Sequence, residues 1–161
     1  MRNQPDTMNT LSLIHEFLDQ RRFAFVGVSR NPKSFSRTLF REFIRQGYDT
    51  IPVNPFAADI DGRRCAPSVH RISPPVTSAL IITSRQTFKP LLRECCQAGI
   101  TLAWMYGVSG PKDLPSGVLH IGEEFGVRMI AGYCPYMFIR NASWFHRIHT
   151  SVWKLVGLYP H

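Results

Sequence analysis

Apolar residues change their spacing repeatedly along the chain, and each change predicts a new helix or strand. Apolar side chains at helical spacing, with acidic residues on the opposite face, predict a first helix over residues 8–20. The next apolar residues, 23–28, form a short continuous run. Such runs are typical of parallel strands that are buried on both faces. The beginning of the chain therefore predicts a helix followed by a buried strand.

This alternation continues to residue 131, with one loop-rich interruption. The further predicted helices cover residues 36–46, 87–98 and 117–125, and the further predicted strands cover 49–54, 79–83, 101–105 and 127–131. Residues 55–77 carry four prolines and are predicted as loop. Strands that alternate with helices predict the α/β class, with a doubly wound sheet of about five parallel strands and helices on both faces.

The end of the chain carries one more helical pattern. Residues 141–157 predict an amphipathic helix with the apolar stripe Trp144, Phe145, Ile148, Val152, Leu155 and Val156. The stripe indicates packing against the domain or against a second copy in a homodimer, and a membrane anchor is the less favoured interpretation. The pattern divides the chain into a domain over residues 1–138 and a helical extension over 139–161.

Composition and charge narrow the class of protein. A chain of 161 residues with 44% hydrophobic residues has the size of one domain and can bury a full core. The formal net charge of +8 suits phosphate ligands, nucleic acid or an anionic membrane. Neither nucleic acid nor a membrane is an expected partner, because no nucleic-acid-binding motif occurs and no apolar run approaches the ~20 residues of a membrane span.

Cysteines and histidines give no metal or catalytic motif. The four cysteines, at positions 65, 95, 96 and 134, lack the spacing of a zinc or dithiol site. Reduced thiols and the lack of a signal-peptide pattern indicate a cytoplasmic protein. His146 and His149 share one helix face, but no third ligand lies near them in the sequence, so no metal site is predicted.

The loop after the first strand is the candidate phosphate site. Gly27 lacks a side chain where backbone could approach a ligand, Ser29 adds a hydroxyl, and Arg30 and Lys33 add positive charge. Ser36 is predicted as the N-cap of the next helix, whose free N–H groups favour anions. A tight turn with surface charges is the alternative. On the phosphate hypothesis, Gly27→Val abolishes ligand binding and leaves the fold largely intact.

The same loop argues against a nicotinamide dinucleotide. The dinucleotide fingerprint needs glycines at two positions that are here Ser29 and Pro32. It also needs an acidic residue near the end of the second strand to hold the ribose hydroxyls, and this chain has Asn54 there, followed by Pro55. NAD is therefore a disfavoured ligand.

Taken in order along residues 8–138, several short motifs resemble one known family. They are Val26-Gly27-Val28-Ser29-Arg30-Asn31-Pro32, Gly47-Tyr48, Ile51-Pro52-Val53-Asn54-Pro55, Pro67-Ser68, Ile82-Thr83, Ala103-Trp104-Met105 and Cys134-Pro135-Tyr136-Met137-Phe138. The family is that of the small stand-alone CoA-binding domain proteins, which are related to the CoA-binding domain of the succinyl-CoA synthetase alpha chain. The resemblance implies a Rossmann-like fold and coenzyme A, or an acyl-CoA, as the bound cofactor.

The resemblance also implies which residues form the site. Contacts with the phosphates are implied for Gly27, Val28, Ser29 and Ser36. Asn54 and Thr83 would line the path of the adenosine and pantetheine groups, with Pro55 beside them in the groove.

The chain departs from the family pattern in three places. Val28 stands where alanine is usual, and Ser34 stands where many members have the loop lysine, so that Arg30 or Arg37 would take over its phosphate contact. Ser84-Arg85 follows Thr83 where prolines are frequent.

Three hypotheses on function remain open at this point. The first is a CoA-binding module without catalysis of its own. The second is a subunit of a nucleotide-dependent oxidoreductase or transferase that uses NAD(P). The third is an interaction protein that keeps the fold and has lost the ligand. Cys134 has two interpretations of its own, a thiol that forms a mixed disulfide with CoA or a buried structural thiol.

Overall fold

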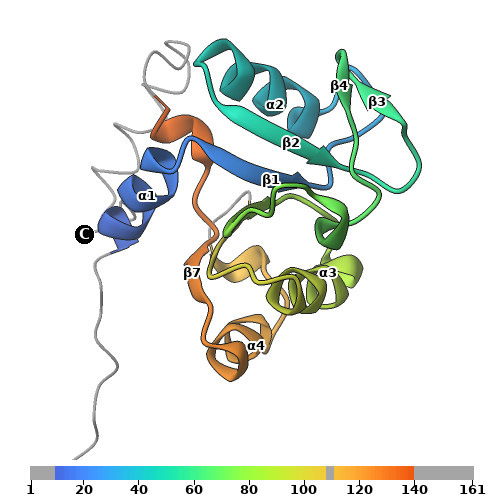
Figure 1. Ribbon diagram of the computed structural model, residues 1–161. Coiled ribbons are helices and arrows are strands. Elements are labelled where there is room, and N and C mark those ends of the chain that lie inside the picture. The colour runs from blue at the N-terminus through green and yellow to red at the C-terminus, as the bar shows by residue number, and fades with distance from the viewer. Residues whose placement is uncertain (1–9, 108–110, 140–161) are drawn as a thin grey trace, which may run out of the picture.

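The computed structural model describes residues 10–107 and 111–139. Its centre is a sheet of five parallel strands in the order β2-β1-β5-β6-β7 (Figure 1). The strands are β1 (Arg22–Val26), β2 (Asp49–Val53), β5 (Ser78–Ile81), β6 (Leu102–Met105) and β7 (Arg128–Ala131). The predicted α/β class with a doubly wound parallel sheet is therefore confirmed.

Helices cover both faces of the sheet because alternate strand residues point to opposite sides. The four helices are α1 (Thr10–Asp19), α2 (Phe35–Arg45), α3 (Arg85–Gln97) and α4 (Val118–Phe125). On one face, α1 and α2 pack with Phe23 and Phe25 of β1 in one buried cluster. On the other face, α3 and α4 pack with Ala24 and Val26 in a second cluster.

The two faces differ in the size of their side chains. The α1–α2 face is aromatic, with the ring centroids of Phe17 and Trp104 5.4 Å apart and edge to face. The α3–α4 face carries a row of small residues, because Ala24 pairs with Ala79 and Ala79 pairs with Ala103 across three neighbouring strands. All three alanines are fully buried, so this row brings the backbone of the sheet close to the helices that cover it.

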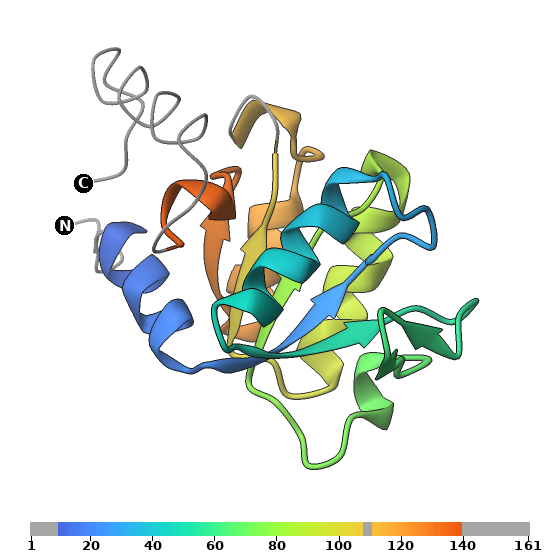
Figure 2. The same cartoon turned by 90° about the horizontal axis from the view of Figure 1, so that it is seen from above.

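The sequence prediction missed a β hairpin. Part of the segment predicted as loop forms an antiparallel hairpin of β3 (Asp59–Ile60) and β4 (Arg63–Arg64), which lies beside β2 at the edge of the sheet. Figure 2 shows this hairpin in green next to the sheet. Its turn is Asp61-Gly62, with both residues at positive φ, 49° and 77°. Such Asp-Gly turns are a signature of two-residue hairpins, whereas strands of two residues are too short to show a periodic pattern.

Three short 3₁₀ helices complete the described elements. They are η1 (Val69–Arg71), η2 (Pro111–Asp113) and η3 (Pro135–Met137). No helix in the described ranges has both the length and the hydropathy that crossing a membrane requires.

The predicted N-cap of α2 was wrong by two residues. Ser34, not Ser36, is the N-cap, and its Oγ accepts a hydrogen bond from the backbone N–H of Arg37 at 3.3 Å. Ser36 lies within the first turn and is buried. The predicted helix over 141–157, with His146, His149 and the possible homodimer contact, lies outside the described residues. The domain boundary after residue 138 also stays a prediction.

Candidate functional site

The candidate site lies where the order of the strands reverses. From β1 the chain passes to β2 on one side and later returns to β5 on the other side. Ligands of doubly wound folds bind beyond the carboxyl ends of the strands at such a point. Two cavities open there, a first of about 530 Å³ and a second of about 490 Å³. Both are lined by Gly27, Ile82 and Thr83.

Gly27 is required by the fold itself. It has φ +92°, a left-handed conformation that side chains rarely adopt, and a Cβ at this position would overlap the carbonyl oxygen of Ile82. The backbones of the two adjoining strands therefore approach each other closely at this glycine. The expectation that Gly27→Val leaves the fold largely intact is wrong, because the first group that a side chain meets is the protein's own backbone.

Two serine hydroxyls hold the loop after β1 in shape. The backbone N–H of Ser29 donates to the Oγ of Ser36 at 3.0 Å, and the Oγ of Ser29 accepts from the backbone N–H of Asn31 at 3.1 Å. Ser36 is only 6% exposed, so its hydroxyl is an internal brace. The loop is thus preorganised by hydrogen bonds within the protein. Ser36 contributes to the site by supporting the backbone of this loop.

Arg37 is a second brace of the same loop. Its Nη1 donates to the carbonyl oxygens of Ser29 and Arg30 at 3.1 and 3.3 Å, and its Nε and Nη2 bind both carboxylate oxygens of Asp61 at 2.6 and 2.8 Å. Hydrogen bonds from Arg37, and then from Arg41, hold the pKa of Asp61 well below its usual range. Because these bonds engage its guanidinium, Arg37 does not replace the loop lysine of the family.

Arg30 is the cation that faces the first cavity. Its side chain is exposed, lines this cavity and lies 6.0 Å from the ring centroid of Phe56. Lys33 is also exposed, but it is not among the residues that line either cavity. Of the two cations predicted for the site, Arg30 lines the first cavity and Lys33 lines neither cavity.

Asn54 joins the loop after β1 to the loop after β2. Its Nδ2 donates to the carbonyl oxygen of Val28 at 2.9 Å, and its Oδ1 accepts from the backbone N–H of Phe56 at 2.8 Å. Val28 has no exposed surface and packs into the aromatic core, whereas the neighbouring Pro55 is exposed. Asn54 therefore sets the distance between the two loops that frame the cavity.

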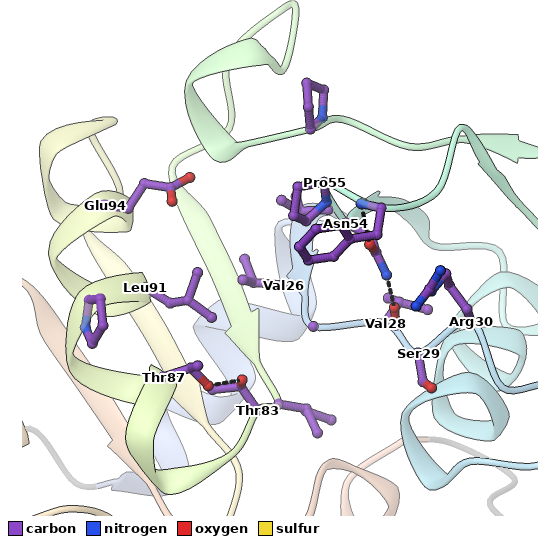
Figure 3. A pocket seen from close by; sticks show the side chains of 16 residues that line it. Val26, Val28, Ser29, Arg30, Asn54, Pro55, Thr83, Thr87, Leu91 and Glu94 are labelled. Atoms are coloured by element: carbon purple, nitrogen blue, oxygen red, sulfur yellow. Dashed lines mark hydrogen bonds between the residues drawn. The ribbon is translucent and has the colours of Figure 1, made fainter.

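The opposite wall comes from β5 and α3. Figure 3 shows Thr83, Thr87, Leu91 and Glu94 across the cavity from Asn54 and Arg30. The hydroxyls of Thr83 and Thr87 are hydrogen-bonded to each other, and Glu94 Oε1 accepts from the backbone N–H of Val69 at 3.0 Å.

Sequence reasoning found Thr83 and missed the other wall residues. Thr87, Leu91 and Glu94 recur four and then three residues apart, which places them on one face of a helix. That spacing was a usable signal. Phe56, 76% exposed at the mouth of the cavity, was also missed.

The second cavity is lined by Tyr106 and Arg85, among other residues, and both make contacts within the protein. The rings of Tyr106 and Phe35 are stacked with centroids 4.8 Å apart, and burial raises the pKa of Tyr106 to about 12. Arg85 Nη1 donates to the carbonyl oxygen of Asp113 at 2.6 Å. The phenol of Tyr106 therefore stays protonated at neutral pH.

Cys134 is buried and lines neither cavity. Its thiol lies in the aromatic core. Burial raises the pKa of Cys134 to about 11. Because the thiolate is the reactive form, this environment favours the structural interpretation over a mixed disulfide with CoA.

Cys134 of the native protein is accordingly expected to react with iodoacetamide at neutral pH about a hundredfold more slowly than the same residue in urea. The reason is the small thiolate fraction together with burial. Mass spectrometry of the peptide that contains Cys134 gives both rates from the same sample series. Equal rates in the native and unfolded protein would contradict the assignment of Cys134 as a structural thiol.

Comparison with known proteins decides the family. Residues 21–139 match the sequence profile of the family described as CoA binding domain, and this match covers more than half of the chain. The chain belongs to the CoA-binding domain family. The resemblance that the motifs carried is thereby confirmed, and the site at the carboxyl ends of β1, β2 and β5 lies within the matched residues.

Relatives of this CoA-binding domain include larger proteins. The alpha subunit of acetate–CoA ligase (ADP-forming) II from Pyrococcus furiosus is 26% identical over 129 residues, which cover 76% of this chain and 28% of that subunit. The chain thus spans little more than a quarter of that curated relative.

Solved structures share the fold. A hypothetical protein from Pyrococcus horikoshii OT3 superposes with a TM-score of 0.69 and 22% identity, over 84% of this chain and 94% of the other. A conserved hypothetical protein from Pyrococcus furiosus gives 0.64 and 24%, over 71% of this chain and 95% of the other. At these identities the likeness concerns the Rossmann-like architecture.

Proposed function

We propose that the chain binds coenzyme A or an acyl-CoA in the first cavity and has no catalytic activity of its own. The observation that carries the proposal is the frame of this cavity. A preorganised loop presents the exposed cation Arg30 to this cavity, opposite the wall of α3, and the amide of Asn54 lies just beyond the end of β2. Membership of the CoA-binding domain family supports the same ligand.

The shape of the site suits a nucleotide with a long arm. Cavities of about 300–1,000 Å³ with mostly apolar walls and a few polar groups are typical of cofactor sites. The exposed ring of Phe56 offers a surface on which an adenine can stack. Because the two cavities meet at Gly27, Ile82 and Thr83, an extended ligand can begin in the first and continue into the second.

Arg30 favours CoA over NAD. Its guanidinium makes no hydrogen bond or ion pair among the described residues, so it is available to the 3′-phosphate that CoA carries on its ribose. An NAD site places a carboxylate at the end of the second strand. The carboxylate that lines this cavity, Glu94, comes instead from α3 and accepts a hydrogen bond from Val69.

A reducing, cytoplasmic location is part of the proposal. All four cysteines are free, and three of them are buried. Disulfides form and persist in oxidising compartments, so a protein with four unpaired cysteines is suited to a reducing one.

Isothermal titration calorimetry with CoA, dephospho-CoA and NAD tests the ligand. CoA is expected to bind most tightly, dephospho-CoA about tenfold more weakly at low salt, and NAD most weakly. Arg30→Ala is expected to remove the preference for CoA over dephospho-CoA, whereas the matched variant Lys33→Ala keeps it. The preference is expected to shrink as salt is added, because Arg30 is exposed to solvent.

Two outcomes would replace the proposal by its alternatives. Displacement of CoA by an equal concentration of NAD favours a nucleotide-dependent oxidoreductase or transferase subunit. Failure of all three nucleotides to bind to folded protein favours an interaction protein that has lost the ligand.

A further inference from the structure

A separate cavity with a basic lining lies beside the edge strand β2. Its volume is about 640 Å³, and its lining includes Arg22, Arg64 and Arg71 but no acidic residue. We call it the arginine pocket. The residues come from the start of β1, from the β3–β4 hairpin and from η1, so the pocket is formed by three elements that the fold brings together.

One of the three arginines is neutralised within the protein. Arg22 binds Asp49, with Nε 3.0 Å from Oδ2, and its Nη1 donates to the carbonyl oxygens of Pro74 and Pro75. Asp49 also pairs with Arg63 at 3.1 Å. A single carboxylate is therefore shared by two guanidinium groups, and this edge of the molecule keeps an excess of positive charge.

The other two arginines have no partner in the described part of the chain. Arg64 and Arg71 are exposed, and their guanidinium groups make no hydrogen bond or ion pair there. Other arginines of the chain do pair, as Arg128 does with Glu16 through two bonds of 2.6 Å. Two unpaired guanidinium groups on the wall of one cavity are arranged to receive an anion.

The chemistry of the pocket favours phosphate. The planar guanidinium presents paired donors that match phosphate oxygens, and two such groups suit a ligand with at least two negative charges. A cavity encloses a small molecule, whereas nucleic acid and acidic proteins bind over broader surfaces. We propose that the arginine pocket is a second ligand site, for a small phosphorylated anion, and that Arg64 and Arg71 bind its phosphate.

This site is distinct from the proposed CoA site but adjoins it. Pro67 lines both the arginine pocket and the first cavity. The preceding Ala66 accepts a hydrogen bond from the backbone N–H of Asn54 at 3.0 Å. Because the two sites share a wall, a test must separate binding in one from binding in the other.

Titration of inorganic pyrophosphate into the full chain, followed by amide NMR, tests the proposal. Saturable shift changes are expected at residues 64–73. The double variant Arg64→Ala, Arg71→Ala is expected to weaken these changes about tenfold in affinity. Arg30→Ala, which removes the free cation of the first cavity, is expected to leave them unaltered. Since both arginines are exposed and unpaired, the double variant should keep the wild-type urea midpoint.

Several results would overturn the proposal. One is the absence of saturable shifts at residues 64–73 in the wild-type protein, a result that does not depend on any variant. Another is unchanged affinity in the double variant. Tighter binding of succinate than of pyrophosphate at these residues would assign the pocket to carboxylates, and tighter binding of a short DNA oligonucleotide would assign it to nucleic acid. None of these results depends on whether CoA binds in the first cavity.

Discussion

Gly27→Ala is expected to lower the free energy of unfolding by about 4 kcal/mol or more. Two causes act together. The residue has φ +92°, and the new Cβ would overlap the carbonyl oxygen of Ile82. Because that oxygen belongs to the backbone just beyond β5, relief requires β1 and β5 to move apart at their carboxyl ends. Urea unfolding followed by far-UV circular dichroism measures the loss.

Gly99→Ala is the matched control for backbone conformation. Gly99 has φ +89°, and a Cβ there would meet nothing within 4 Å. Gly99→Ala is expected to lower the free energy of unfolding by about 1–2 kcal/mol. This is the penalty for a non-glycine residue in the left-handed conformation alone. The difference between the two variants isolates the contact with Ile82. If both lose the same stability, the close approach of the strands at Gly27 is not what requires a glycine.

Asn54→Ala is expected to lower the free energy of unfolding by about 2 kcal/mol and CoA affinity about tenfold. The substitution removes the donor to Val28 and the acceptor for Phe56, which are 2.9 and 2.8 Å away. The carbonyl oxygen of Val28 then loses a partner in a partly buried position, and the exposed backbone N–H of Phe56 loses one as well. The two loops that frame the first cavity are no longer tied together. Urea unfolding and CoA titration measure the two effects separately.

Asn31→Ala provides the comparison. Its Oδ1 accepts from the backbone N–H of Lys33 at 3.0 Å, a local bond within one exposed loop. Its loss is expected to cost about 0.5 kcal/mol and to leave CoA affinity close to that of the wild type. Equal effects of the two substitutions would show that the connection between the loops does not preorganise the site.

Much of the fold follows from the apolar pattern. The five parallel strands were predicted because a strand covered on both faces needs a short apolar run, and residues 23–28 and 101–105 are such runs. The sequence does not decide which residue caps α2, because Ser34 and Ser36 are both good N-caps by residue type. Burial of Ser36 beneath the loop is a tertiary effect, and the sequence contains no local signal of it.

The site was predicted in part for the same reason. A glycine at the end of the first strand marks the loop, and the topology of a doubly wound sheet places that loop at the ligand. The need of the fold for Gly27 was missed because its contact, Ile82, comes from a different part of the chain. The spacing of Leu91 and Glu94 places them on one helix face with Thr87, but only the way α3 lies on the sheet turns that face toward the cavity.

The row of alanines beneath α3 affects the width of the first cavity. Ala24, Ala79 and Ala103 determine how closely α3 can approach the sheet, and α3 carries one wall of the first cavity. Larger residues in that row would lift the helix and open the cleft without altering any group that faces the ligand. The width of the first cavity is thus set from the interior of the domain, by residues that do not line it.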